Sequence, residues 1–293
     1  MKAAAFSYAR ATSVADALLL LAHHGDEAKV LSGGQSLMPA LNLRLSRPAI
    51  LVDIGRLSEL RGITVAGNKV TIGALTRHVD LLGSEEIAQI LPLLREAAAH
   101  VAHPAIRNRG TIGGSLAHAD PASELPACMV ALNATIIISG PAGERRVPAS
   151  DFFTGIYETV LSSQELLVAV EFPVAQKNSV HFFSEFARRH GDYAIVGLAA
   201  QAVVEKDILT DLRPVFFAVG DRPALVKASA KLLKTIVTSA LLAEVSEDLS
   251  QELDPPEDQQ ASSPMRRHLA KVLLARCLSA FLGRPDLNAG GSV

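Results

Sequence analysis

The chain has 293 residues, a net charge of -2, 49% hydrophobic and 20% charged residues, which is typical of a well-buried globular protein of two or three structural units. The balanced charge argues against a nucleic-acid surface, which needs clustered Lys and Arg. No apolar run approaches the roughly 20 residues of a membrane span, and the N-terminus is too polar after Ala5 for a signal peptide. We therefore expect a cytoplasmic protein.

The chain has only two cysteines, Cys128 and Cys277, which lie far apart and form no CxxC motif. A disulfide framework or a thiolate metal cluster is therefore not expected. Each cysteine falls in an apolar, helix-like stretch, which predicts a small buried side chain rather than a reactive thiol.

The first part of the chain alternates helices and strands. Apolar spacing predicts a helix over Val14–His24 and a strand over Lys29–Leu31. A short helix with Ser36 as its N-cap is predicted over Leu37–Leu45, followed by a buried strand over Ile50–Ile54.

The middle part carries more strand. Strands at Ile63–Ala66 and Lys69–Ile72 flank turn residues and predict a β-hairpin. Thr76 is suited to cap a helix that runs toward Leu82, and a single long helix is predicted over Ile87–His100.

After a glycine-rich stretch, Glu124–Leu132 predicts a helix. Strands are expected at Thr135–Ser139 and Arg145–Val147, joined by a Gly-Pro-Ala-Gly turn, and then at Leu166–Phe172.

The last part predicts an antiparallel sheet followed by two helices. The three strands are Val180–Phe186, Ala194–Val204 and Val215–Val219, and the helices are Leu241–Leu253 and Pro264–Leu282. Ser263 before Pro264 is typical of an N-cap followed by proline at the first helical position.

The segment SGGQS, Ser32 to Ser36, leaves a predicted strand and enters a predicted helix. Glycines at such a place let main-chain N–H groups line a concave nest that binds phosphate without Lys or Arg. The dinucleotide fingerprint GxGxxG is absent, and so is a P-loop. Alone, a Gly-Gly pair after a strand is more often an ordinary turn.

A second segment, GTIGGS (Gly110 to Ser115), also combines main-chain amides and hydroxyls with little side-chain bulk. Two such loops suit a ligand with two phosphates and long arms, such as a dinucleotide. Asp120 and Glu124 follow and are able to accept hydrogen bonds from sugar or ribityl hydroxyls. The alternatives are an Asx-turn before Pro121 and a carboxylate that favours the first turn of a helix.

His100, His103, His118 and Asp120 lie near one another in the sequence and suggest a metal site. Histidines spaced around a helix end are more often surface or capping residues, so we predict no metal site. We also assign no catalytic acid, base or nucleophile.

The segments LSGGQSLMPALNLRLSRPAILVDI and HPAIRNRGTIGGSLAHADPASELPA resemble the FAD-binding medium subunit of the molybdenum hydroxylases, the carbon monoxide dehydrogenase and xanthine dehydrogenase family. The later RRHGDYAIVG matches a third family segment, and the resemblance extends over nearly the whole chain. The order and length of these motifs make it specific.

The resemblance implies an α+β fold of the vanillyl-alcohol oxidase type, in which two α+β subdomains hold FAD, plus a C-terminal antiparallel sheet-and-helix domain. We expect the FAD-binding subdomains at residues 1–56 and 57–177. The C-terminal domain is expected at 178–285, after the polar stretch AQKNS, and a disordered tail at 286–293.

Carried over residue by residue, the resemblance implies sixteen FAD-binding residues. The two loops wrap the pyrophosphate and its surroundings, Asp120 or Glu124 binds hydroxyls, and Val101, Leu167 and Tyr193 lie at the flavin. The full set is Ser32, Gly33, Gly34, Gln35, Ser36, Leu37, Val101, Thr111, Ile112, Gly113, Gly114, Ser115, Asp120, Glu124, Leu167 and Tyr193. One departure concerns Ala187, where many relatives have a lysine.

The family implies that FAD carries the redox chemistry here. A large subunit holds a molybdopterin cofactor, a small subunit holds two [2Fe–2S] clusters, and the three subunits form a dimer of heterotrimers. In this arrangement the FAD takes electrons from the clusters and passes them to an external acceptor. Two alternatives are a free-standing FAD-dependent reductase or oxidase of the same fold, and a nucleotide-binding scaffold without flavin.

Overall fold

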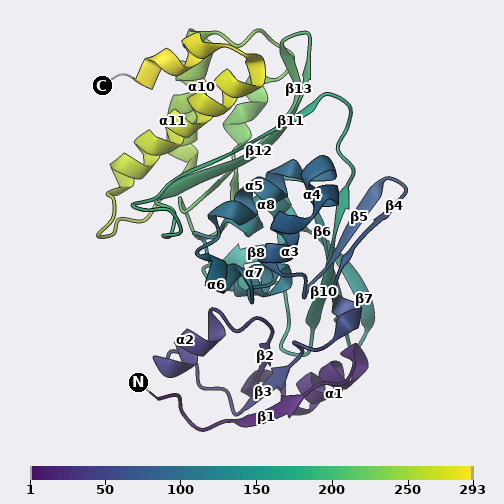
Figure 1. Ribbon diagram of the computed structural model, residues 1–293. Helices are drawn as coiled ribbons and strands as arrows, with labels where there is room; N and C mark the ends of the chain where they lie inside the picture. The colour runs from purple at the N-terminus through teal and green to yellow at the C-terminus, as the bar shows by residue number, and fades with distance from the viewer. Residues whose placement is uncertain (1, 292–293) are drawn as a thin grey trace.

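The computed structural model describes residues 2–291, which form three units stacked along the molecule (Figure 1). The N-terminal unit lies at one end, a middle unit with a five-stranded sheet follows, and the C-terminal sheet with its two long helices lies at the other end. This arrangement leaves the cavity described below between the first two units, with a loop of the third at its wall.

The N-terminal unit contains a three-stranded parallel sheet in the order β1-β3-β2. Its elements are β1 (Ser7–Arg10), α1 (Val14–His24), β2 (Ala28–Leu31), α2 (Leu37–Asn42) and β3 (Ile50–Asp53). The predicted helix α1 is confirmed, whereas the short, mostly exposed β1 was not predicted, because SYAR carries no apolar run. The carboxyl end of β2 delivers the chain into the SGGQS loop.

The middle unit is built on an antiparallel sheet in the order β4-β5-β10-β6-β7. Its strands are β4 (Ile63–Ala66), β5 (Lys69–Gly73), β6 (Thr135–Gly140), β7 (Gly143–Pro148) and β10 (Leu166–Pro173). Its helices are α3 (His78–Gly83), α4 (Glu85–Ile90), α5 (Pro92–His100), α6 (Pro104–Arg107), α7 (Ile112–His118), α8 (Glu124–Ala131) and α9 (Ala149–Phe152). A small hairpin, β8 (Phe153–Gly155) with β9 (Glu158–Thr159), precedes β10.

Three local predictions for this unit are wrong. The long helix predicted over Ile87–His100 is broken into α4 and α5 at Leu91, whose backbone is not helical and is followed by Pro92. The Thr76 hydroxyl donates to the carbonyl of Gly62 instead of capping α3, which begins after Arg77. The glycine segment after Thr111 is helix α7, because Thr111 caps it through the amide of Gly114.

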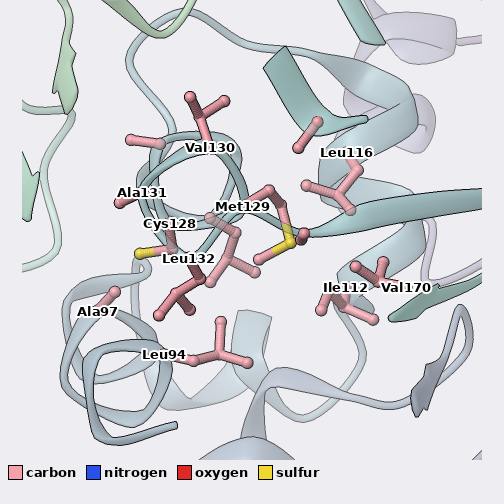
Figure 2. Close-up of a cluster of buried hydrophobic side chains, with 14 of the residues drawn as sticks. Leu94, Ala97, Ile112, Leu116, Cys128, Met129, Val130, Ala131, Leu132 and Val170 are labelled. Carbon is pink, nitrogen blue, oxygen red and sulfur yellow. The ribbon is translucent and has the colours of Figure 1, made fainter. Parts of the chain in front are cut away.

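The core of the middle unit lies where its helices pack on one another and on the sheet. Figure 2 shows Cys128 of α8 on the side of Ala97 of α5, and Met129 of α8 on the side of Ile112 and Leu116 of α7. Cys128 and Cys277 are both fully buried, as predicted, and burial raises the pKa of each thiol. Helix α8 therefore has a fixed position, which matters because its first residue is a candidate site residue.

The C-terminal unit is an antiparallel sheet in the order β11-β12-β13-β14. Its elements are β11 (Ser179–Phe186), β12 (Val196–Glu205), β13 (Ile208–Phe217), β14 (Ala224–Leu225), α10 (Ser239–Glu252) and α11 (Ser263–Leu282). Helix α11 packs on the sheet from one side, and α5 and α8 of the middle unit contact β11, β12 and β13.

Three details of this unit differ from the predictions. The third strand begins at Ile208 rather than Val215, and the N-cap of α11 is Ser262, which places Ser263 in the first turn. The tail predicted to be disordered continues as a 3-10 helix over Pro285–Gly291, because Leu287 is buried in the core of this unit. Residues 292–293 of that tail lie outside the described residues.

None of the helices within residues 2–291 combines the length and the apolar character that a bilayer crossing requires.

Arg266 of α11 is a buried charge that ties the C-terminal unit together, with 3% of its surface exposed. Its guanidinium donates to the carbonyls of Ile195 and Ala218 and to the carboxylate of Asp258. These contacts hold the start of β12, the end of β13 and the loop before α11 in one arrangement.

We expect Arg266→Met to lower the free energy of unfolding by about 3 kcal/mol, because two buried carbonyls and a carboxylate lose their donor. Urea unfolding measures this change. The control is Lys271→Met, which removes a surface ion pair with Glu247 and is expected to cost under about 1 kcal/mol. Equal effects of the two variants would contradict the structural role of Arg266.

Candidate functional site

The two glycine loops, far apart in the sequence, meet in space. The hydroxyl oxygens of Ser32 and Thr111 lie 2.8 Å apart. A Cβ on Gly33 would stand 2.2 Å from the carbonyl oxygen of Arg109, and one on Gly114 would come within 3.7 Å of the Ser32 hydroxyl. The backbones therefore approach so closely that a side chain at Gly33 has no room.

The first loop presents a row of unused donors. Among residues 2–291, no protein acceptor takes the main-chain N–H of Gly33, Gly34, Gln35 or Ser36. Gly34 adopts a φ of +73°, a conformation that favours glycine, and the Gln35 side chain donates to the carbonyl of Gly33 at 3.0 Å. Consecutive free amides in a turn form a nest that suits an anion.

The second loop contributes mainly shape. The amides of Ile112 and Gly113 donate to the carbonyls of Thr76 and Ala74, and the amide of Gly114 donates to the Thr111 hydroxyl. A Cβ on Gly113 would lie 2.6 Å from that of Ala74. The expectation that both loops offer free amides is therefore wrong for these three, since α7 and its contact with the end of β5 use them.

One cavity of about 930 Å³ is lined by every predicted site residue except Ile112. Such a volume lies at the upper end of what ligand pockets enclose. Ile112 is fully buried in the core of the middle unit instead. A hydrophobic residue inside a motif carries no signal that separates a ligand contact from a core contact, and here packing takes the side chain.

The end of the cavity beyond the second loop is held by the side chain of Arg107 and by a close backbone contact at Gly191. The guanidinium of Arg107 donates to the carbonyls of Val101 and Ala102, both at 2.9 Å. Gly191, with a φ of +84°, lies against Ala102 and His103, so a Cβ there would meet the Ala102 carbonyl at 2.7 Å. This contact places Tyr193 at the cavity wall.

Ala187 follows β11, and the next residue, Arg188, is exposed.

Asp120 forms the Asx-turn that the sequence offered as an alternative role. Its Oδ1 accepts from the amide of Ala122 at 2.9 Å, and its Oδ2 is 3.4 Å from the hydroxyl of Tyr157. Tyr157 comes from the β8–β9 hairpin, has a φ of +56°, and lies against His118 with ring centroids 4.9 Å apart. Sequence reasoning missed Tyr157, because no motif marks a residue of a hairpin 37 positions away from its partner.

Leu167 and Tyr193 lie at the cavity with different exposure. Leu167 of β10 is buried in the core of the middle unit and sits at a bulge between Leu167 and Ala169. Tyr193 is 66% exposed, and partial burial together with the charges of Asp120 and Glu124 raises the pKa of its hydroxyl.

Glu124, the first residue of α8, is a carboxyl that the fold has largely removed from water. It is 8% exposed, and burial raises the pKa of its side chain from 4.5 to about 8, with the charge of Glu185 adding to the rise. Glu124 thus holds a proton at neutral pH, so it is able to donate a hydrogen bond as well as accept one.

The raised pKa of Glu124 predicts how stability depends on pH. The folded chain keeps a proton that the unfolded chain releases above its ordinary pKa of 4.5, so this group's contribution to stability is lost as pH rises toward about 8. In Glu124→Gln this loss is absent. We expect the difference in unfolding free energy, variant minus wild type, to increase from about pH 5 to about pH 8.5. Urea titrations of the cofactor-free chain measure it.

The control for this experiment is Glu96→Gln, since Glu96 is a solvated carboxylate paired with His181 on the surface. Parallel curves for wild type and Glu124→Gln across that pH range would contradict the assignment.

Within residues 2–291, no group of three or more His, Cys, Asp or Glu side chains is placed to hold a metal ion. His100 and His118, which the sequence brought to attention, contact Glu185 and Tyr157 respectively.

Comparison with known proteins identifies the fold and the family. Residues 4–175 match the model of the FAD binding domain in molybdopterin dehydrogenase, and residues 181–281 match the CO dehydrogenase flavoprotein C-terminal domain. The chain is 41% identical to the 6-hydroxypseudooxynicotine dehydrogenase complex subunit alpha of Paenarthrobacter nicotinovorans, over 97% of each chain. It is 34% identical to the carbon monoxide dehydrogenase medium chain of Hydrogenophaga pseudoflava, over 95% of this chain and 98% of that one.

Comparison with solved structures identifies the same family. The chain matches carbon monoxide dehydrogenase from Hydrogenophaga pseudoflava with a TM-score of 0.94 and 35% identity, covering 97% of this chain and 99% of that one. It matches quinoline 2-oxidoreductase from Pseudomonas putida 86 with a TM-score of 0.90 and 38% identity, with the same coverage. The predicted FAD-binding fold with a C-terminal sheet domain is confirmed. This chain is a member of the family of FAD-binding medium subunits of molybdenum hydroxylases, which are oxidoreductases.

Proposed function

We propose that this chain is the electron-transfer flavoprotein of its complex: it binds FAD in the cavity, takes electrons from [2Fe–2S] clusters of a small subunit, and passes them to an external acceptor. FAD supplies the redox chemistry, and the chain binds, orients and shields it. Residues 1–56 and 57–177 enclose the cofactor, and residues 178–285 form a domain that closes one end of the site.

The observation that carries the FAD proposal is the row of free amides at Gly33, Gly34, Gln35 and Ser36, at the point where the two loops touch. Four consecutive amides without a protein acceptor within residues 2–291 form a nest that fits an anionic ligand. We assign these amides to the FAD pyrophosphate. The hydroxyls of Ser32 and Thr111 lie beside them and are able to donate to the same group.

The remaining site residues take the roles that the family resemblance implies. Asp120 or Glu124 binds hydroxyls of the ligand, and Val101, Leu167 and Tyr193 lie at its ring system; all five residues line the cavity. Leu37, Gly113, Gly114 and Ser115 complete the wall near the pyrophosphate.

The iron–sulfur clusters and the molybdopterin cofactor belong to partner subunits in this proposal. Two isolated, fully buried cysteines do not ligate an iron–sulfur cluster, which takes four ligands. We therefore place both [2Fe–2S] clusters in a small subunit and the molybdopterin cofactor in a large one, and we propose a dimer of heterotrimers in the cytoplasm. Relatives named for nicotine, caffeine and carbon monoxide share 34–37% identity with this chain along most of its length. Such likeness across different substrates supports substrate selection in the large subunit.

The first test concerns FAD binding. Gly33→Ala places a methyl group 2.2 Å from the Arg109 carbonyl and forces the loops apart, so we expect at least a tenfold loss of FAD affinity. Flavin fluorescence titration of the cofactor-free chain measures it. The matched control is Gly83→Ala, where a Cβ meets nothing within 4 Å. Wild-type affinity in Gly33→Ala, with the fold retained by circular dichroism, would contradict the assignment.

The second test concerns electron transfer. In the purified complex, reduction of the iron–sulfur clusters is expected to be followed by bleaching of the visible flavin bands, which stopped-flow absorbance resolves. A complex assembled with Gly33→Ala is expected to accumulate reduced clusters and to pass few electrons to an added acceptor. If acceptor turnover stays at the wild-type rate in a complex without flavin, the proposed role of this chain is wrong.

A further inference from the structure

His78 is a buried histidine at the wall of the cavity that none of the roles assigned above uses. It opens α3, has 5% of its surface exposed and lies among the cavity-lining residues. Both of its ring nitrogens are buried, and neither has a hydrogen-bond partner among residues 2–291. Buried polar groups are normally paired, so an unpaired imidazole at a ligand cavity needs an explanation.

The main chain holds the His78 side chain beside the second loop. The amide of His78 donates to the carbonyl of Gly110 at 3.0 Å. The residues next to these two, Arg77 and Thr111, pair as an isolated antiparallel bridge. The start of α3 is thus tied to the second loop, and the imidazole ring lies at that loop.

Gly110 lies between the His78 ring and the first loop. A Cβ on Gly110 would stand 2.9 Å from Cε1 and 3.0 Å from Nδ1 of His78. On the other side, a Cβ on Gly33 would stand 3.0 Å from the Cα of Gly110. The imidazole therefore packs on the junction of the two loops, one glycine away from the first loop. The ligand group that we assigned to this junction is the diphosphate at the Gly33–Ser36 amides.

Packing alone does not require a histidine at this position. An apolar side chain of similar size would pack against Gly110 without burying two unpaired nitrogens. The second-loop amides of Ile112, Gly113 and Gly114 donate within the protein, so they are not available to an anion. The ring N–H of His78 adds a donor on this side of the site.

The charge state of His78 suits such a role. Burial lowers the pKa of its ring from 6.5 to about 4, the main chain of Thr111 acts in the opposite direction, and the cation of Arg107 adds to the lowering. The ring is therefore neutral at pH 7, with one N–H donor and one acceptor nitrogen. It is able to donate to a phosphate oxygen without burying a charge of its own.

We propose that His78 is a further ligand-binding residue of this site, whose ring N–H donates to an oxygen of the FAD diphosphate at the junction of the two loops. The inference rests on the proposed function for the identity of the ligand. It extends that function by adding a donor that neither glycine segment contains.

The first experiment compares stability with affinity. His78→Leu removes the unpaired nitrogens and keeps an apolar side chain against Gly110. We expect the cofactor-free variant to unfold at the same urea concentration as the wild type or at a higher one. Its FAD affinity is expected to fall by about tenfold, because a phosphate oxygen loses its donor. Urea unfolding and flavin fluorescence titration measure the two quantities.

The matched control is His181→Leu, which removes a histidine that pairs with Glu96 at the surface and is not among the residues that line the cavity. We expect wild-type FAD affinity in this control. Wild-type affinity in His78→Leu would overturn the inference. A loss of affinity accompanied by an equal loss of stability would overturn it as well, because it would mean that the ring supports the fold rather than the ligand.

The second experiment locates the hydrogen bond along the ligand. ADP carries the diphosphate without the flavin, and riboflavin carries the flavin without the diphosphate. Displacement of bound FAD by ADP measures ADP affinity, and we expect His78→Leu to lower it by the same factor as FAD affinity. Riboflavin affinity is expected to stay the same. The reverse pattern, with riboflavin weakened and ADP unaffected, would contradict the assignment to the diphosphate.

The third experiment needs only the wild-type chain, so it remains decisive if His78→Leu does not fold. NMR spectra that correlate the ring nitrogens of isotope-labelled histidines with their carbon-bound protons show which nitrogen is protonated. We expect the protonated nitrogen of His78 to shift when ADP or FAD is added, and its N–H proton to exchange more slowly with water. Unchanged His78 resonances with FAD bound would overturn the inference. Failure of the wild-type chain to bind FAD would refute the proposed function instead.

Discussion

The site depends on one close approach, that of the backbone at Gly33 to the backbone at Arg109 and Gly110. Any residue with a Cβ at Gly33 would collide with the Arg109 carbonyl, so the two loops meet only because glycine stands there. The contact is secured by the hydroxyls of Ser32 and Thr111, which belong to different units of the chain. This junction brings both loops into the wall of the cavity between the first two units.

The lack of side chains in the two glycine loops therefore has two distinct causes. At Gly33 and Gly113 it is required by other parts of the protein, namely Arg109 and Ala74, whereas Gly34 needs its left-handed backbone conformation. We place the anion in the first loop, where the amides of Gly33 to Ser36 have no protein acceptor within residues 2–291. The second loop forms the opposite wall of the site, and its amides donate within α7 and to residues that follow β5. The second loop is thus held by the protein's own hydrogen bonds, and the first loop supplies the donors for a ligand.

Most of the architecture could be predicted from the sequence, because α1, the β4–β5 hairpin, β6, β10 and α8 carry clear apolar periodicity. The break at Leu91 was marked in the sequence by Pro92, which does not fit a helix interior, and the prediction of one helix over Ile87–His100 gave the apolar spacing more weight than the proline. The site residues came from motifs and a family resemblance, and the structure gathers all but Ile112 at one cavity. Tyr157, Arg107 and Glu185 could not be predicted, since their roles arise only when distant segments pack together.

We propose that the Gly33–Ser36 amides hold the diphosphate of FAD, whereas the Ile112–Gly114 amides donate to acceptors within the protein. Amide hydrogen exchange, resolved to single residues by NMR with and without FAD, tests this claim most directly. We expect fast exchange of the Gly33, Gly34 and Gln35 amides in the free chain, with strong protection once FAD is bound. The Gly113 amide is expected to be protected in both states. Unchanged exchange in the first loop, with FAD bound, would contradict it.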